Sequence, residues 1–139
     1  MAKISHSEEI NAPFDTVWKL LLDKAEHPDR TIKEVESVKI LERYDDGILR
    51  EMKAVGMTIK ERIRIDEKNK LIKFDLVENP MFTGYFINKV DVTPEEKITL
   101  TYEQNWTPLN QEAKKMEQKF LQVLINAVKE MKNLVNTKN

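Results

Sequence analysis

Glu42, Arg50 and Glu61 are the residues of this sequence best suited to chemistry in an apolar environment. They lie in segments where apolar and polar residues alternate, which is typical of β-strands that bury one face. A turn with Gly47 in its left-handed position predicts that Glu42 lies opposite Arg50, and a turn at Gly56-Met57 extends the same face to Glu61. We therefore expect the three ionisable side chains as neighbours on a face that is otherwise apolar.

Three charges on an apolar face are unfavourable unless they are paired. One interpretation is a polar anchor on a cavity wall, with Met52 opposite Glu61, that positions a hydroxyl, carbonyl or amine of a ligand. Two carboxylates around one arginine could also leave one Glu with a raised pKa, which suits general acid–base catalysis. The alternatives are a structural ion-pair network at a solvated end of the sheet, or a register that turns these side chains outward.

A second set of polar residues is expected on the last hairpin of the sheet. With Val92 opposite Ile98, the alternation puts Asn88, Tyr102 and Gln104 on one face among apolar residues. Their amide and hydroxyl groups could hydrogen-bond a ligand inside an apolar pocket. An aromatic core whose polar groups are satisfied within the protein is an equally good interpretation.

A sheet and one long helix must position these residues. Apolar residues recur at steps of three and four from Gln111 to Thr137, which predicts an amphipathic helix with Asn110 as its N-cap. A strand over Lys3–Ile10 and a helix that opens at Pro13 come first in the chain. The segment from Glu34 to Trp106 has a period of two and predicts six strands in a meander. The expected sheet is antiparallel, with one apolar and one charged face.

The long helix is apolar over about half of its circumference, so it must contact two partners. The first is the apolar face of the sheet, against which Phe120, Leu124 and Ala127 are expected to be buried. The second is the helix that opens at Pro13, which would pack against Leu121 and Ile125, and dimerisation through that flank is the alternative. A pocket between helix and sheet is expected to be lined by Phe74, Phe86, Tyr102, Trp106, Met116 and Phe120.

Length and composition exclude several classes of function. A chain of 139 residues is expected to form a single domain over residues 1–139. Its formal net charge is -1 with Lys and Glu interleaved, so no basic stripe for nucleic acid is present, and no apolar run is long enough for membrane insertion. Without Cys there is no thiol chemistry, and three separated glycines cannot form a P-loop or a dinucleotide motif.

No metal site, cofactor or signal peptide is expected either. A cluster near a loop could be interpreted as a metal site, but it is more simply a solvated run of charge; its members are Asp23, Glu26, His27 and Asp29. The N-terminus lacks the apolar core of a signal peptide, so a cytoplasmic protein is expected.

A strand that ends in Ile10-Asn11-Ala12-Pro13 is followed by Phe14-Asp15-Thr16-Val17-Trp18, then by a strand meander and a long closing helix. In this order of elements the whole chain resembles the START/polyketide-cyclase/pollen-allergen (SRPBCC) superfamily. Glu26-His27-Pro28 and Leu49-Arg50-Glu51 resemble its AtaL-like branch, which is largely uncharacterised. The resemblance implies an α+β helix-grip fold, in which a curved antiparallel sheet of about seven strands wraps around the C-terminal helix with a cavity between them. Members of the superfamily bind lipids, sterols, hormones or polyketides, and some are cyclases; the fold alone does not choose among these.

The favoured hypothesis is a module that binds a small hydrophobic or amphipathic molecule, as a monomer or homodimer. The second is an enzyme of the cyclase or dehydratase type that uses Glu42, Arg50 or Glu61 with Tyr102. The third is a protein-interaction domain with a vestigial cavity. The expected ligand-binding residues are Glu42, Arg50, Met52, Glu61, Phe74, Phe86, Asn88, Tyr102, Gln104, Trp106, Met116 and Phe120.

Overall fold

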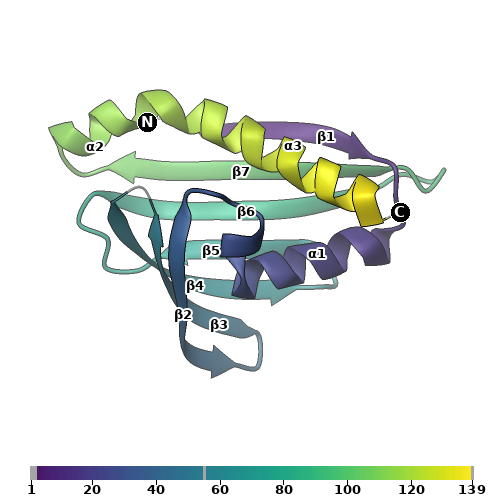
Figure 1. The fold of residues 1–139 in the computed structure, drawn as a ribbon, viewed down its shortest axis with the longest axis horizontal. Helices are drawn as coiled ribbons and strands as arrows, with labels where there is room; N and C mark the ends of the chain where they lie inside the picture. Colours follow the sequence, from purple (N-terminus) through teal and green to yellow (C-terminus); the bar gives the residue numbers. More distant parts are fainter. Residues whose placement is uncertain (1–2, 55, 139) are drawn as a thin grey trace.

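The computed structural model describes residues 3–54 and 56–138 and confirms the expected order of strand, helix, six strands and long helix (Figure 1). The strands are β1 (Ile4–Ile10), β2 (Val35–Tyr44), β3 (Gly47–Ala54), β4 (Met57–Asp66), β5 (Leu71–Leu76), β6 (Phe82–Val92) and β7 (Ile98–Pro108). The helices are α1 (Phe14–Glu26), α2 (Gln111–Met116) and α3 (Phe120–Lys138), with short 3-10 helices over Pro28–Arg30 and Glu117–Lys119.

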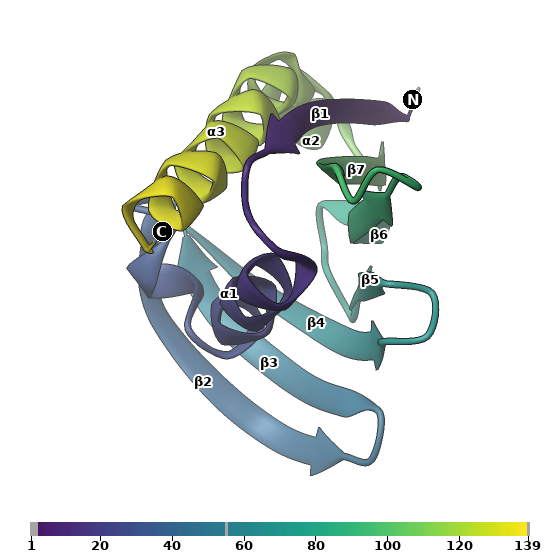
Figure 2. The same cartoon turned by 90° about the vertical axis from the view of Figure 1, so that its right-hand side faces the viewer.

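The seven strands of the described residues form one antiparallel sheet in the order β1-β7-β6-β5-β4-β3-β2. Strands β2 to β7 are a meander, and β1 pairs with β7 at the far edge. The sheet is strongly curved, with α1 on its concave side and α3 lying along β1 (Figure 2). This arrangement is the helix-grip fold that the sequence predicts.

The concave face of the sheet carries the core. Ile63, Ile72 and Leu100 are fully buried there and belong to the same cluster as Val17 and Leu21 of α1. Because successive side chains of a strand point to opposite faces, the intervening residues of these strands lie on the convex face. The sequence pattern of one apolar and one charged face is therefore reproduced.

The first two hairpin turns are tighter than predicted. Tyr44 pairs with Gly47, which leaves the two residues between them as the turn and makes Gly47 the first residue of β3. A Cβ atom on Gly47 would lie 1.9 Å from the carbonyl oxygen of Ile63, so the close approach of β4 requires glycine here. Ala54 pairs with Met57, so Met57 belongs to β4; Val55 lies outside the described residues.

The long C-terminal helix begins at Gln111, as predicted, and the Oδ1 atom of Asn110 accepts a hydrogen bond from the backbone N–H of Ala113 at 2.8 Å. One 3-10 turn separates α2 from α3, a local tightening that the apolar periodicity does not reveal. The buried face of α3 consists of Leu124, Val128, Met131 and Val135. Leu124 is buried as predicted, whereas Phe120 and Ala127 are only half-buried.

The predicted contact of Leu121 with the first helix is wrong. Leu121 is 47% exposed, near the start of α3. Helix α3 packs mainly along β1 and touches α1 only lightly. Figure 1 shows the reason, since only the C-terminal end of α3 comes near α1.

Candidate functional site

Arg50 and Glu61 form an ion pair inside the protein. They lie directly opposite each other on β3 and β4, and each side chain is 4% exposed. The Nη2 atom of Arg50 donates to Oε1 of Glu61, and Nη1 donates to the carbonyl oxygen of Ala25 at 2.8 Å. Ala25 is in the last turn of α1, where carbonyl groups lack partners within the helix. The guanidinium group therefore joins two strands to the end of α1.

The prediction that Glu42 joins this pair is wrong. The register of β2 and β3 shifts between Ile40 and Glu42, so Ile40 pairs with Arg50 whereas Glu42 pairs with Leu49. One extra residue in a strand moves the following side chains to the other face. Glu42 is exposed and accepts a hydrogen bond from the hydroxyl group of Tyr44. The buried cluster therefore contains one carboxylate, and the interpretation of two carboxylates around one arginine fails.

Lys24 of α1 is a buried amine that was not predicted from the sequence. Its side chain reaches the concave face of the sheet, and the residue is 5% exposed. The Nζ atom lies 4.7 Å from the ring centroid of Tyr102, 4.9 Å from that of Phe74 and 5.7 Å from that of Phe86. Within the described residues, Lys24 Nζ forms no hydrogen bond or ion pair. Three aromatic rings therefore surround an amine that lacks an acceptor.

The surroundings of Lys24 disfavour its charge. Burial, and then the nearby cation of Arg50, lower the pKa of Lys24 to about 7, although the carboxylate of Glu61 acts in the opposite direction. One feature of the sequence indicates that Lys24 is buried. Lys24 lies three residues after Leu21 and seven after Val17, on the apolar stripe of α1. A charged residue on such a stripe is the feature that could have identified it.

Asn88 and Tyr102 are the centre of a buried polar patch beside Lys24. They lie directly opposite each other on β6 and β7 and are 0% and 1% exposed. Among the described residues, neither amide atom of Asn88 nor the hydroxyl group of Tyr102 has a hydrogen-bond partner. Burial and the charge of Glu130 raise the pKa of Tyr102, so its hydroxyl group remains a hydrogen-bond donor. Gln104, the third predicted member, is also buried.

The predicted aromatic residues form two groups. Phe86 packs edge-on against both Phe74 and Tyr102, with ring centroids 5.9 and 5.5 Å apart, beside the polar patch. Further along β7, Trp106 forms a second group with Phe120 at the start of α3. Their ring centroids are 5.6 Å apart.

The second group also contains Phe82, which contacts both Trp106 and Phe120. The indole nitrogen of Trp106 is buried and, within the described residues, has no hydrogen-bond partner. Met52 and Trp106 pack against the same small cluster, and Met52 lies opposite Ile59, not opposite Glu61 as predicted. Met116 is half-buried at the end of α2.

The charged residues at the end of α1 form ion pairs. Asp23 pairs with Arg30 at 2.9 Å, and Glu26 pairs with Arg43 at 2.8 Å. In residues 3–54 and 56–138, no three His, Asp or Glu side chains are arranged to hold a metal ion.

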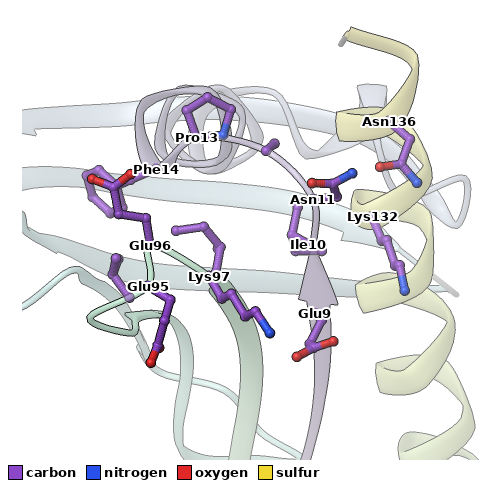
Figure 3. A pocket seen from close by; sticks show the side chains of 13 residues that line it. Glu9, Ile10, Asn11, Pro13, Phe14, Glu95, Glu96, Lys97, Lys132 and Asn136 are labelled. Carbon is purple, nitrogen blue, oxygen red and sulfur yellow. The ribbon is translucent and has the colours of Figure 1, made fainter.

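A cleft of about 1110 Å³ lies where β1 leads into α1, between the β6–β7 loop and the C-terminal part of α3 (Figure 3). Pro13 and Phe14 line it together with charged residues such as Glu9, Lys97 and Lys132. None of the predicted ligand-binding residues lines this cleft. It is therefore separate from the patch around Asn88 and Tyr102.

The same fold occurs in solved structures of low sequence identity. The Zhui aromatase/cyclase from Streptomyces sp. R1128 matches with a TM-score of 0.78 and 17% identity, over 97% of this chain and 93% of that one. A START superfamily protein from Mycobacterium smegmatis matches with a TM-score of 0.77 and 17% identity, over 99% of each chain. Ginseng major latex-like protein 151 from Panax ginseng matches with a TM-score of 0.75 and 21% identity, over 95% of each chain.

A search of curated proteins found no match. None of the helices in the described part of the chain has both the length and the apolar character needed to cross a membrane. A family model described as acetylaranotin biosynthesis cluster protein L, AtaL, matches residues 5–136. This match shows that the chain belongs to the AtaL family, and the chain shares its helix-grip fold with a START superfamily protein and an aromatase/cyclase.

Proposed function

We propose that this protein binds a small hydrophobic or amphipathic molecule between α3 and the concave face of the sheet. The observation that carries the proposal is the group of buried polar atoms without partners on Asn88 and Tyr102. Leaving a buried donor or acceptor unsatisfied costs about 1–3 kcal/mol per group. A ligand with a hydroxyl or carbonyl group would satisfy several of these atoms at once.

The rest of the patch suits the apolar part of such a ligand. Phe74 and Phe86 present aromatic surface beside Asn88, and the second aromatic group with Trp106 and Phe120 continues along the same strands. An apolar site with a few convergent polar groups is the usual composition of a small-molecule site. Solved proteins of this fold include one named as an aromatase/cyclase, which is consistent with an organic ligand.

Native mass spectrometry of the purified protein after incubation with a metabolite extract tests this proposal. We expect one retained molecule of defined mass per chain. Failure to retain any molecule, together with failure to bind an apolar reporter dye, would favour a protein-interaction domain with a vestigial cavity.

A cyclase or dehydratase reaction in the same site is the second candidate function. The buried Arg50–Glu61 pair and the protonated hydroxyl group of Tyr102 are groups that favour it. Glu61 could accept a proton from a carbon next to a carbonyl group, while Arg50 and Tyr102 stabilise the oxygen that becomes negative. Turnover of the retained molecule, lost in Glu61→Gln while binding remains, would show catalysis. Retention without turnover would indicate a binding module.

A further inference from the structure

Lys24 is the only amine placed against this patch by the described residues, and it is the polar group that the proposed function leaves without a role. We propose that Lys24 captures a carbonyl compound, an aldehyde or a ketone, as an imine on the concave face of the sheet. This inference rests on the proposed function, because the carbonyl compound occupies the same site as the proposed ligand.

Within the described residues, the amine of Lys24 lies among aromatic rings and not in an ion pair. The amine is surrounded by the rings of Phe74, Phe86 and Tyr102, which attract a cation but accept no conventional hydrogen bond. Glu61 is the carboxylate whose charge affects the pKa of Lys24, and it already accepts a hydrogen bond from Arg50. The Lys24 amine therefore has no counter-ion of its own within the described structure.

The charged groups around Lys24 act in opposite directions, because the cation of Arg50 on β3 lowers its pKa and the carboxylate of Glu61 on β4 raises it. Glu61 is also paired with Arg50, and Tyr102 on β7 stays protonated. On α1 itself, Asp23 and Glu26 pair with other arginines. Burial and Arg50 together bring the pKa of Lys24 to about 7, so a large fraction of the amine is nucleophilic at neutral pH. Lysines that form imines are activated in this way, in an apolar pocket or next to another cation.

The reaction needs no oxidant or reductant. The lone pair of Lys24 Nζ forms a bond to the carbonyl carbon, and the C=O π electrons move to oxygen, which takes up a proton. The carbon–oxygen bond of this carbinolamine then breaks, and the oxygen leaves as water with protons that come from the nitrogen. The balance is one carbonyl compound and one amine giving one imine and one water. The free hydroxyl group of Tyr102 and the free amide of Asn88 are donors that can hold the carbonyl oxygen.

The test is reductive trapping with hexanal and sodium cyanoborohydride at pH 7.5, followed by peptide mass mapping. We expect one alkyl group at Lys24, added about tenfold or more faster than at other lysines, whose side chains are almost entirely protonated at this pH. The rate at Lys24 should rise with a midpoint near pH 7. The N-terminal amine is mapped separately, since it also titrates near neutral pH.

Two variants and a binding assay make the outcome decisive. Lys24→Arg keeps a cation but should lose the fast label, whereas Lys19→Arg, a change at an exposed position of α1, should keep it. Displacement of an apolar dye by 1-hexanol, which cannot form an imine, measures binding without covalent capture. Dye binding with no preferential label at Lys24 overturns the imine and leaves the proposed function standing. If the protein neither binds the dye nor is labelled preferentially at Lys24, the proposed ligand site and the imine are both overturned. If Lys24→Arg does not fold, the labelling rates in the unmodified protein still decide.

Discussion

Arg50 lies directly opposite Glu61 across β3 and β4, and the ion pair between them is buried against the C-terminal end of α1. A buried pair of this kind is not strong evidence of stabilisation, because both ions lose their hydration. Removing either partner, however, should destabilise the protein strongly, because the other charge is then buried without a partner. The pair therefore fixes how α1 sits on the sheet, and with it the position of Lys24, one residue before Ala25.

Replacement of Arg50 tests the burial of this pair. Arg50→Met leaves the Glu61 carboxylate without its partner, so we expect a loss of about 3–5 kcal/mol in the free energy of unfolding at pH 7.5. Mild acid should restore part of it, because protonation removes the unpaired charge. Urea denaturation at pH 7.5 and pH 5 measures both effects.

Arg64→Met is the matched control, since Arg64 on β4 is an exposed partner of Asp75. The free energy of unfolding of this control should fall by no more than about 1 kcal/mol. If Arg50→Met behaves like this control at both pH values, the pair is not desolvated.

Lys24 predicts a specific dependence of stability on pH. The unfolded chain holds this proton up to a pKa near 10.5, whereas the folded protein releases it near 7. The unfolded state therefore binds more protons between these values, and stability rises with pH in that window. Relative to Lys24→Met, the free energy of unfolding of the native protein should rise by about 3 kcal/mol between pH 7 and pH 9.5. The slope should reach roughly 1.4 kcal/mol per pH unit. Urea titrations of both proteins check this, and a difference independent of pH would show that Lys24 is not buried as a titrating amine.

The orientation of α3 predicts unequal effects for two leucines one turn apart. Leu124 is 2% exposed and belongs to the core cluster, whereas Leu121 is 47% exposed. Leu124→Ala should destabilise the protein by about 2–5 kcal/mol and Leu121→Ala by about 0.5 kcal/mol or less. Thermal denaturation of the two variants is sufficient, and equal losses would mean that α3 is rotated about its axis.

Asn88 predicts opposite effects on stability and on binding. Asn88→Leu removes a buried amide that has no partner in the described structure and fills its space with an apolar side chain. The protein without ligand should therefore become more stable, by about 1–2 kcal/mol. Urea denaturation without ligand measures this, and a loss of stability would mean that the amide is satisfied within the protein.

The sequence predicted the fold because the signals for each element agree. Period-two alternation, Pro13 at the start of the first helix and Asn110 as an N-cap all indicated the observed order. The inward placement of Arg50 and Glu61 was also correct, although the turn between their strands was predicted two residues out of register. An error of two residues leaves each side chain on the same face, because side chains alternate with a period of two.

Other features could not be read from the sequence. The turn at Asp45-Asp46 is one residue tighter than predicted, so Glu42 pairs with Leu49 instead of Arg50, which reverses its face; no glycine or proline marks the register shift that follows at Ile40. Lys24 was missed because a charged residue on an apolar helix stripe is normally assumed to reach solvent. The division of the aromatic residues into two groups depends on where the interrupted C-terminal helix places Phe120 over the strands.

The measurement that tests the central proposal most directly is fluorescence titration with an apolar reporter dye, followed by displacement with 2-decanone. We compare the native protein with Asn88→Leu and with Lys89→Leu, a matched change at the next, exposed position of β6. We expect one dye site per chain. Displacement by the ketone should be about tenfold weaker in Asn88→Leu, which corresponds to one lost hydrogen bond, and unchanged in Lys89→Leu. Failure of the native protein to bind the dye, or equal displacement in both variants, would contradict a ligand site on the concave face of the sheet.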